Sequence, residues 1–421
     1  MKRCGLLGEK LGHSYSPQIH AYIDSYEYRL YEKKPEEVES FLKDGDWDAL
    51  NVTIPYKKLA ASMCDEVSAI VKTLASANTL VKKDGKIYGY NTDYFGFMSM
   101  VQKSGIELEG KKALVLGSGG ASVTVCAVLK KLGAKPVVIS RSGQSNYTNL
   151  YIHSDAGIIV NATPVGMYPA NGRSAVDLDA FPCCTGVMDL IYNPLRTELI
   201  IQAEERGIPC MSGLHMLVAQ AKRSSELFTG SVIPDSAIED IRRKIELEQQ
   251  NIVLIGMPGC GKSTVGALLA SALHMDFVDT DIVLQEEQGK KLQTIIDAVG
   301  NDAFLKIEED CICGLEYNNT VIATGGSVVY GKKAMRHLHE NGLVVYIRLP
   351  YEEIEHRLSN LATRGVTLKK GQTLHSLYDE RIPLYEAEAD CIFDAEKGDV
   401  EKTVLDLADQ LSDRLEANDE R

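Results

Sequence analysis

A glycine-rich segment in the second half of the chain carries the strongest chemical signal. Residues 256–263 read GMPGCGKS and fit the spacing G-x-x-x-x-G-K-[ST], between an apolar run at 252–255 and a helix-forming stretch at 264–273. Such a loop points backbone N–H groups at phosphates, while the lysine reaches the β- and γ-phosphates and the next hydroxyl ligates Mg²⁺. The spacing predicts ATP and Mg²⁺ binding for phosphoryl transfer, but it does not identify the acceptor. The predicted nucleotide contacts are Gly256, Gly259, Cys260, Gly261, Lys262, Ser263 and Thr264, with Ser263 also a metal ligand.

A second glycine-rich loop, at residues 117–122, lies between the apolar run 113–116 and a helix-forming stretch at 121–132. It reads GSGGAS, a variant of G-x-G-x-x-G with Ser122 in the third glycine position. The next apolar run ends about 20 residues on, where NAD-binding domains usually carry an acidic residue, but here Ser-Arg-Ser follows. An arginine suits a 2′-phosphate, so NADP is favoured over NAD, although an exposed loop cation is the alternative. The predicted cofactor contacts here are Gly117, Ser118, Gly119, Gly120, Ala121, Ser140, Arg141 and Ser142.

Regular alternation of apolar runs with amphipathic stretches indicates the elements that position these loops. The alternation predicts an α/β protein, and 421 residues are enough for roughly three domains. Two nucleotide loops that each follow an apolar run predict two nucleotide-binding domains, and about 100 residues precede the first of them. The charged stretch 234–250 is predicted to be a helix that closes the first part of the chain rather than a flexible tether.

The charge balance limits the classes of partner. The chain has 45 Lys and Arg against 59 Asp and Glu, a net charge of −14. We therefore expect no nucleic-acid partner and no binding to anionic membranes, because both require a positive surface. We also expect no transmembrane helix and no signal peptide. The ten cysteines lack the spacing of a disulfide framework or a zinc site, which favours reduced thiols in a cytoplasmic protein.

The first half of the chain resembles shikimate dehydrogenase through motifs that follow the family order. They are HSYSP at 13–17, NVTIPYK at 51–57, ANT at 77–79, NTD at 91–93, NATP at 161–164 followed by GM at 166–167, Tyr192, and GLHMLVAQ at 213–220. The resemblance implies that the substrate contacts are Ser14, Ser16, Asn51, Thr53, Asn78, Tyr192 and Gln220. It also implies cofactor-side contacts from Asn161, Thr163 and Met167.

Lys57 and Asp93 suit the chemistry that this resemblance implies. Reduction of 3-dehydroshikimate delivers hydride to a ring carbonyl carbon and requires a proton for the carbonyl oxygen. A lysine beside an aspartate tends to stay protonated, so Lys57 is expected to act as acid and electrostatic stabiliser, with Asp93 as its partner. Outside its motif, Lys57 would be interpreted as a surface cation.

The second half resembles shikimate kinase over roughly residues 250–395. The resemblance places Asp279 near the metal and Asp281 on the substrate hydroxyls as the base. Gly325 and Gly326 then face the substrate, Arg364 belongs to a lid over the phosphates, and Arg381 holds the substrate carboxylate. A lid that excludes water and a cation that offsets transition-state charge fit phosphoryl transfer. Helix capping and surface ion pairing are the alternative for the two aspartates and Arg381.

Three departures from the family patterns stand out. The kinase motif F-R-x-x-E reads FLKIE at 304–308, so Leu305 replaces an arginine that helps to hold the substrate carboxylate, and Lys306 points about 100° away on a helix. The lost contact is worth on the order of 1.5–3 kcal/mol. Ser327 replaces the usual third glycine of the kinase motif. In the first half, residues 142–157 form a short crossover, for which we expect a shortened helix and a less secure 2′-phosphate site.

These observations predict a bifunctional α/β enzyme of aromatic amino-acid biosynthesis. Residues 1–103 with 214–248 would form the substrate domain of the dehydrogenase, and 104–213 a Rossmann NADP domain. Residues 249–421 would form a P-loop domain with a parallel sheet, like that of the nucleoside-monophosphate kinases. The enzyme would reduce 3-dehydroshikimate with NADPH and then phosphorylate shikimate with ATP and Mg²⁺. The alternatives keep the dehydrogenase but give the kinase half another small hydroxylated substrate, or make it a nucleotide-binding regulatory module. The oligomeric state is left open.

Overall fold

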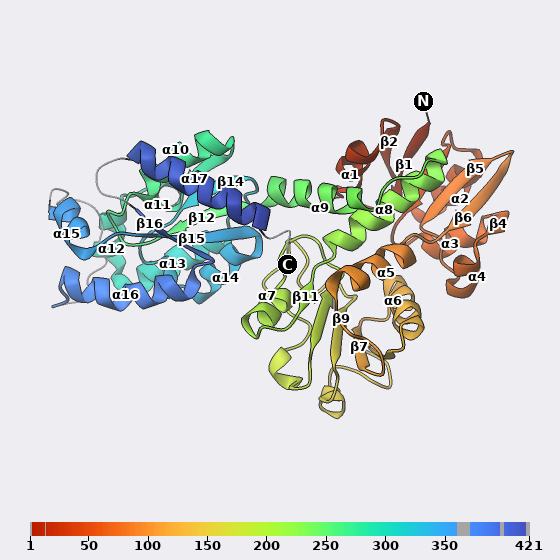
Figure 1. Cartoon of the computed structure of the whole chain (residues 1–421), viewed down its shortest axis with the longest axis horizontal. Helices are drawn as coiled ribbons and strands as arrows, with labels where there is room; N and C mark the ends of the chain where they lie inside the picture. The colour runs from red at the N-terminus through yellow and green to blue at the C-terminus, as the bar shows by residue number, and fades with distance from the viewer. Residues whose placement is uncertain (1, 13, 360–370, 396–399, 418–421) are drawn as a thin grey trace. The chain divides into compact units, whose positions relative to one another are not determined.

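The computed structural model describes residues 2–12, 14–359, 371–395 and 400–417. The chain divides into two compact units, Met1–Glu246 and Leu247–Arg421, whose helices and strands are labelled in Figure 1.

The first unit begins with a six-stranded mixed sheet in the order β2-β1-β3-β5-β6-β4. β1 pairs in parallel with β2 and β3, whereas β5 pairs antiparallel with β3 and β6. Leu7, Leu50 and Leu80, on β1, β3 and β5, are buried with Trp47, so this sheet has its own core. The strands are β1 (Arg3–Gly8), β2 (Glu27–Glu32), β3 (Ala49–Val52), β4 (Glu66–Val67), β5 (Thr79–Lys83) and β6 (Lys86–Tyr90). The helices of this region are α1 (Ser16–Ile23), α2 (Pro35–Asp44), α3 (Lys57–Ser62) and α4 (Ala69–Leu74).

A five-stranded, fully parallel sheet follows in the order β11-β10-β9-β7-β8. Along β7, Ala113 and Val115 pack into one cluster of buried side chains, and Leu114 and Leu116 pack into another. Both faces of the sheet are therefore covered, as parallel sheets require. The strands are β7 (Lys112–Leu116), β8 (Lys135–Ile139), β9 (Ile158–Asn161), β10 (Gly186–Asp189) and β11 (Cys210–Met211). The helices are α5 (Asp93–Ser104), α6 (Gly120–Lys131), α7 (Glu198–Glu205) and the 3-10 helices η1 (Leu150–His153) and η2 (Leu178–Ala180).

The connection from β8 to β9 confirms the expected short crossover, because its helical element is the four-residue η1. Two further helices, α8 (Leu214–Thr229) and α9 (Ser236–Gln249), complete this part of the chain. The helix predicted at 234–250 is therefore confirmed as α9. Buried side chains of α8 pack with those of α1 and α9, so α8 returns to the first sheet after the second one is complete.

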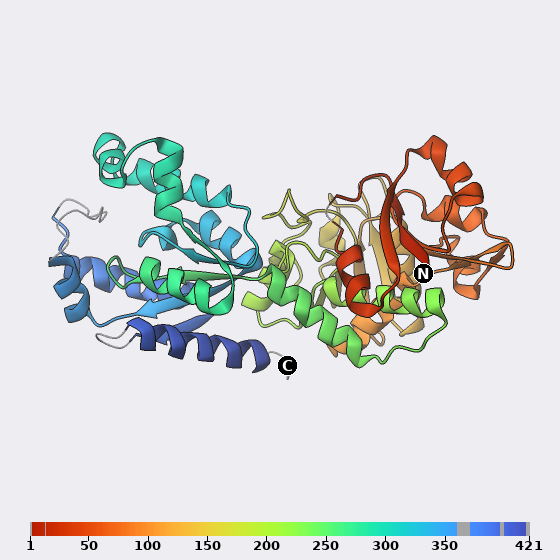
Figure 2. The ribbon, with the colours of Figure 1, turned by 90° about the horizontal axis from the view of Figure 1, so that it is seen from above.

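The second unit has a five-stranded parallel sheet in the order β13-β14-β12-β15-β16. Figure 1 shows α10 and α17 on one side of it and α14 and α16 on the other, and α17 lies beside α10 in Figures 1 and 2. The strands are β12 (Asn251–Ile255), β13 (Asp276–Asp279), β14 (Thr320–Ala323), β15 (Gly342–Arg348) and β16 (Cys391–Asp394). The helices are α10 (Lys262–Leu273), α11 (Thr280–Gln288), α12 (Leu292–Val299), α13 (Asn301–Cys313), the 3-10 helix η3 (Val328–Tyr330), α14 (Lys332–Asn341), α15 (Tyr351–Ser359), α16 (Leu374–Glu388) and α17 (Val400–Ala417).

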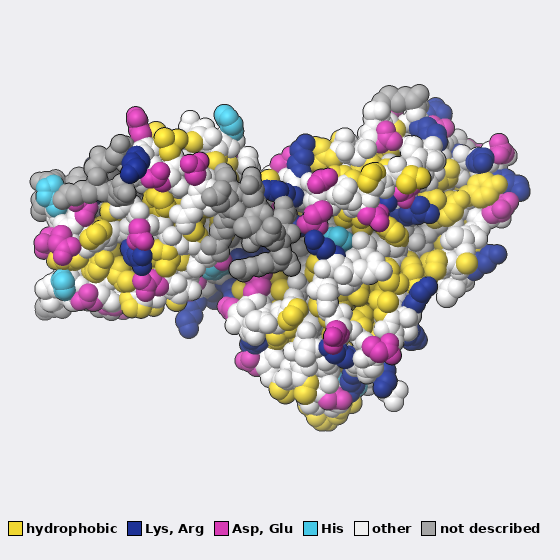
Figure 3. Space-filling model, in the orientation of Figure 1, with side chains coloured by type: hydrophobic (Ala, Val, Ile, Leu, Met, Phe, Trp, Pro, Cys, Tyr) yellow, Lys and Arg dark blue, Asp and Glu magenta, His cyan; other side chains and the backbone are white. Residues whose placement is uncertain are grey.

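The predicted α/β class and the parallel sheets of both nucleotide-loop regions are confirmed. Acidic and basic side chains are interspersed on the face shown in Figure 3, despite the net charge of −14. Among the described residues, we find no helix with the length and apolar character needed to cross a membrane.

Candidate active sites

A cavity of about 440 Å³ opens in the first unit beside β1 and β3, within the usual size range for small-molecule sites. Its wall contains every side chain predicted to bind the substrate of this half, together with Lys57 and Met167. Those substrate residues are Ser14, Ser16, Asn51, Thr53, Asn78, Tyr192 and Gln220. The fold thus collects in one place residues that are widely separated along the chain.

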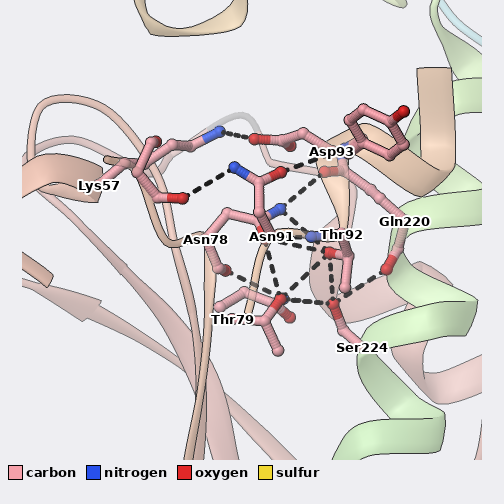
Figure 4. Close-up of polar contacts among 11 residues, drawn as sticks. Lys57, Asn78, Thr79, Asn91, Thr92, Asp93, Gln220 and Ser224 are labelled. Carbon is pink, nitrogen blue, oxygen red and sulfur yellow. Dashed lines mark hydrogen bonds and ion pairs between the residues drawn. The ribbon is translucent and has the colours of Figure 1, made fainter. Parts of the chain in front are cut away.

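Lys57 and Asp93 form an ion pair at this cavity. Lys57 begins α3, Asp93 begins α5, and Lys57 Nζ lies 2.7 Å from Asp93 Oδ2 (Figure 4). The carboxylate side chain is 7% exposed and the lysine side chain 20% exposed, so water screens the pair only partly. A protonated ammonium in this position can donate a hydrogen bond to an oxygen that becomes negative during a reaction.

Buried hydroxyl and amide groups hold Asn78 in place behind the ion pair (Figure 4). Asn78 Oδ1 accepts from the Thr92 backbone N–H at 2.6 Å, and Asn78 Nδ2 donates to Gln220 Oε1 at 3.3 Å. The Ser224 hydroxyl lies 3.0 Å from each of the Thr79 and Thr92 hydroxyls. Sequence reasoning missed Ser224, yet it lies four residues after Gln220 on α8 and therefore on the same helix face. A polar residue in that position was a signal that could have been used.

Asn51 is held by hydrogen bonds from two sides. One of its partners, Tyr28, stacks on a histidine to which sequence reasoning gave no role. Asn51 Oδ1 accepts from the Tyr28 hydroxyl at 2.9 Å, and Asn51 Nδ2 donates to Ser224 Oγ at 2.8 Å. His20 lines the cavity and stacks on Tyr28 with ring centroids 4.0 Å apart. Burial lowers the pKa of His20 to about 3, so this imidazole is neutral in the physiological range.

Part of the cavity wall comes from loops of the second sheet. Met167 and Tyr168 follow β9, while Tyr192 and Asn193 follow β10. Ligands of parallel α/β sheets bind beyond the carboxyl ends of the strands, which is where these loops lie. The Tyr192 ring packs on that of Tyr15, with centroids 5.2 Å apart, and burial raises the pKa of the Tyr192 phenol.

The loop at 117–122 joins β7 to α6, as the motif predicts. Gly117 has φ +100°, and a Cβ there would lie 2.9 Å from the Thr163 side chain. Gly119 and Gly120 have open space where a Cβ would lie, so their backbone is accessible beside the start of α6. Ser122 is buried in the third glycine position, where its small side chain fits. Of the other residues predicted here, Ser118 is exposed and Ala121 is half-buried.

The residues predicted to discriminate between cofactors follow β8 directly. Arg141 and Ser142 are exposed and Ser140 is half-buried. At the end of β9, which pairs with the other edge of β7, Asn161 Oδ1 accepts from the Thr163 backbone N–H at 3.0 Å and from its hydroxyl at 2.7 Å. These bonds fix the loop after β9 beside Gly117.

The loop at 256–263 joins β12 to α10 and folds around a lysine. Gly256, Gly259 and Gly261 have φ values of +144°, +82° and +104°, in the region that favours glycine. The side chain of Lys262 is buried, and its Nζ donates to the carbonyls of Gly256 at 2.8 Å and Met257 at 3.0 Å. Cys260 is buried, whereas Ser263 and Thr264 lie in the first turn of α10. The loop and the N-terminus of α10 thus lie together as the motif predicts, and phosphate binding by these residues stays a prediction.

The remaining predicted kinase residues of the described chain lie near one another. Asp279 accepts from the Asp281 backbone N–H at 3.0 Å and caps α11. A Cβ on Gly325 would lie 2.8 Å from Asp281 Oδ1, and one on Gly326 would lie 3.1 Å from an Arg381 guanidinium nitrogen. Arg381 is 1% exposed, so surface ion pairing does not describe this arginine. The predicted lid residue Arg364 lies outside the described residues.

Glu308 also belongs to this cluster, although sequence reasoning gave it no role. A Cβ on Gly325 would lie 2.3 Å from Glu308 Oε1, so this carboxyl faces the same space as Asp281. Burial raises the pKa of Glu308 to about 7, and the nearby charge of Asp281 also raises it. Its position as the glutamate of the FLKIE motif was the available signal. Arg357 was also missed: it donates to the carbonyls of Gly259 and Cys260 at 3.4 Å each.

The folds and sites define two classes of protein in one chain: an α/β oxidoreductase with a dinucleotide-binding sheet, and a P-loop phosphotransferase. Residues 6–80 match the family described as "Shikimate dehydrogenase substrate binding domain". Residues 258–412 match the family described as "Shikimate kinase".

Individual relatives of the first half agree with this assignment. The chain is 35% identical over 269 residues to a "Shikimate dehydrogenase (NADP(+))" of Clostridium perfringens, covering 58% of this chain and 99% of that protein. A crystal structure of shikimate dehydrogenase 1 from Peptoclostridium difficile is 35% identical with a TM-score of 0.56, covering 59% of this chain and 99% of that one. The Thermus thermophilus enzyme in complex with NADP(H) and shikimate is 30% identical with a TM-score of 0.54, covering 58% and 99%. The chain therefore belongs to the shikimate dehydrogenase family through its first half, and it carries a shikimate kinase domain in its second.

Proposed function

We propose that the chain catalyses two consecutive reactions, NADPH-dependent reduction of 3-dehydroshikimate to shikimate and ATP-dependent phosphorylation of shikimate to shikimate 3-phosphate. The observation that carries the proposal is the Lys57–Asp93 pair at a cavity lined by all the predicted substrate residues. The family match of the second half supplies an enzyme for which the first product is the substrate.

In the dehydrogenase half, neutral groups orient the ring and one cation responds to the charge of the reaction. Ser14 and Ser16 bind the substrate carboxylate, and Asn51 and Asn78 bind ring hydroxyls from positions set by their own hydrogen bonds. When bound, NADPH supplies the hydride. Lys57 donates a proton to the carbonyl oxygen and Asp93 stabilises its charged form, which lowers the barrier in the direction of reduction.

The loop at 117–122 fits a dinucleotide because its glycines leave accessible backbone at the start of α6. The names of the relatives, which specify NADP(+), support NADP as the cofactor. Gly117–Ala121 would hold the pyrophosphate and Arg141, between Ser140 and Ser142, the 2′-phosphate. Asn161, Thr163 and Met167 would complete the cofactor side of the cavity.

In the kinase half, the glycine loop and Lys262 would hold the phosphates of ATP, while Ser263 and Asp279 would hold Mg²⁺. Asp281 accepts the proton of the attacking hydroxyl, Gly325 and Gly326 allow the ring to approach closely, and Arg381 pairs with the substrate carboxylate. Arg364, which lies outside the described residues, would cover the phosphates. Each contribution acts by position and charge, as phosphoryl transfer requires.

One alternative for the kinase half follows from Leu305. The missing arginine favours a second candidate function, phosphorylation of another small hydroxylated compound. A nucleotide-binding module without transfer activity is less consistent with the clustering of Asp281, Arg381 and Lys262 around one site.

Two assays on the full chain test the proposal. NADPH oxidation should require 3-dehydroshikimate, and ADP release should require shikimate. ADP release that depends on another ring alcohol would support the second candidate. ATP binding without release for any ring alcohol would leave the regulatory interpretation.

We further propose the three-domain division given by the motifs: 1–103 with 214–248, 104–213, and 249–421. The three separate sheets support it.

The ten cysteines of the described chain are all unpaired, which supports the cytoplasm as the compartment.

A further inference from the structure

Two departures from the kinase motifs, Leu305 and Ser327, affect the surroundings of one buried carboxyl, that of Glu308. Leu305 and Glu308 lie three residues apart on α13, so they share a helix face. Leu305 offers no charge to Glu308. Ser327, in the usual position of a third glycine, instead provides a side-chain hydrogen bond to the Glu308 carboxyl. Where the family pattern has an arginine and a glycine, this chain therefore has a leucine and a serine, and neither side chain brings a positive charge to the glutamate.

The charged groups that face Glu308 come from three other helices. They are Asp281 of α11, Arg381 of α16 and Lys262 of α10. Asp281 shares the space beside Gly325 with Glu308, because oxygens of both carboxyls lie within 3 Å of the Cβ position of Gly325, at 2.3 and 2.8 Å. Placing two negative charges in this space would be unfavourable.

The two cations are both engaged elsewhere as well. Lys262 donates to carbonyls of the glycine loop, and the Arg381 guanidinium lies 5.2 Å from the Tyr330 ring centre and donates to the Tyr330 hydroxyl at 3.4 Å. Burial outweighs their attraction, since the pKa of Glu308 is raised to about 7. On α13 itself, the thiol of Cys311 stays neutral because burial raises its pKa to about 12.

We propose that Glu308 is a specificity-determining residue of the kinase site, and that it must carry a proton for an anionic ring substrate to bind. A protonated Glu308 adds no negative charge beside Asp281 and can donate a hydrogen bond, so Arg381 can hold the substrate carboxylate without a second arginine. An ionised Glu308 repels that carboxylate. Above neutral pH, substrate binding therefore takes up one proton from solvent. This inference rests on the proposed kinase function.

The direction of the pH dependence follows from the sign of the charge. Glu308 holds its proton below about pH 7 and loses it above. Substrate affinity should be constant at lower pH and fall by about tenfold for each pH unit above about 7.

The test is steady-state ADP release by the full chain at saturating ATP and Mg²⁺, with the KM for shikimate measured from about pH 6 to about pH 8.5, a range that spans the titration. The wild-type KM should rise with pH as above. Glu308→Gln, a neutral isostere, should keep a low KM across the range. Leu305→Arg should also flatten the profile, because the guanidinium pairs with the ionised carboxylate. Asp310→Asn, an exposed carboxylate on the same helix, is the matched control and should keep the wild-type profile.

A constant wild-type KM, or a Glu308→Gln profile that still rises with pH, would overturn the inference. Loss of turnover in Glu308→Gln would also overturn it, provided that ATP still raises the unfolding temperature of the variant and so shows a folded kinase unit. Absence of shikimate-dependent ADP release by the wild type at every pH would instead overturn the proposed kinase function.

Discussion

The two candidate sites differ in the charged groups that surround the space predicted to bind an anionic substrate. In the dehydrogenase cavity, Lys57 and Asp93 are the charged pair among the predicted residues, and neutral amides and hydroxyls provide the other contacts. In the kinase site, the buried Glu308 and the half-buried Asp281 lie together beside Gly325, with two cations nearby. Neutral hydrogen bonds keep their geometry over a wide pH range, whereas buried charges shift one another's pKa. We therefore expect the kinase site to be the more sensitive of the two to a change in nearby charge, such as the absence of the arginine that Leu305 replaces.

The largest expected effect is a loss of the dehydrogenase activity alone, with the kinase activity unchanged. Lys57→Met should lower the rate of NADPH oxidation by roughly 10²- to 10⁴-fold, the usual range for a positioned acid. ADP release should be unchanged, because the kinase cluster contains none of the affected groups. Lys58→Met removes an exposed lysine next to it and should leave both rates at the wild-type level. A Lys57→Met enzyme with near-normal NADPH oxidation would remove Lys57 from the chemistry.

Adding the missing arginine should make the kinase site resemble its family. At a pH of about 7 or above, Leu305→Arg should lower the KM for shikimate by roughly ten- to a hundredfold, the value of one charge-assisted hydrogen bond. The dehydrogenase KM serves as an internal control. An unchanged kinase KM would show that another cation already completes the carboxylate site.

A smaller effect is expected at Arg141, the predicted contact of the NADPH 2′-phosphate. Because Arg141 is exposed, Arg141→Ala should raise the KM for NADPH by only about tenfold. The KM for NADH should not change, since NADH lacks the 2′-phosphate. Equal effects on both cofactors would contradict the predicted role of Arg141.

The smallest effect is expected from a change in the hydrogen-bonded hydroxyl and amide groups around Ser224. Ser224→Ala removes a hydroxyl near those of Thr79 and Thr92 and an acceptor for Asn51. It should lower the free energy of unfolding by about 1–3 kcal/mol and raise the KM for 3-dehydroshikimate only a few-fold. Denaturant unfolding and kinetics measure the two quantities. Ser231→Ala, at an exposed serine just after α8, should change neither, and an equal loss there would show that the network contributes nothing.

The loops were predictable from sequence because their chemistry is local. Gly256, Gly259 and Gly261 adopt positive φ values that the glycine spacing anticipates, and the run before each loop is a strand because it is apolar and short. The short crossover between β8 and β9 was equally readable, since too few residues remain there for a long helix.

Groups whose role depends on burial were harder to find. Nothing in the letters FLKIE states that Glu308 is 4% exposed or that it faces Asp281. Ser224 contacts Asn51 across 173 positions of sequence, and such a contact depends on α8 returning to the first sheet.

The sequence by itself therefore determined the candidate catalytic and binding residues, the two glycine-rich loops between a strand and a helix, and the α/β class. Spacing and hydropathy specify these over a few residues at a time. Only the tertiary structure decided that Lys57 meets Asp93, that Arg381 is buried, and that Leu305 leaves a carboxyl without a partner guanidinium on its own helix. Hydrogen bonding and pKa depend on distance and on exclusion of water, and both are properties of the packed chain.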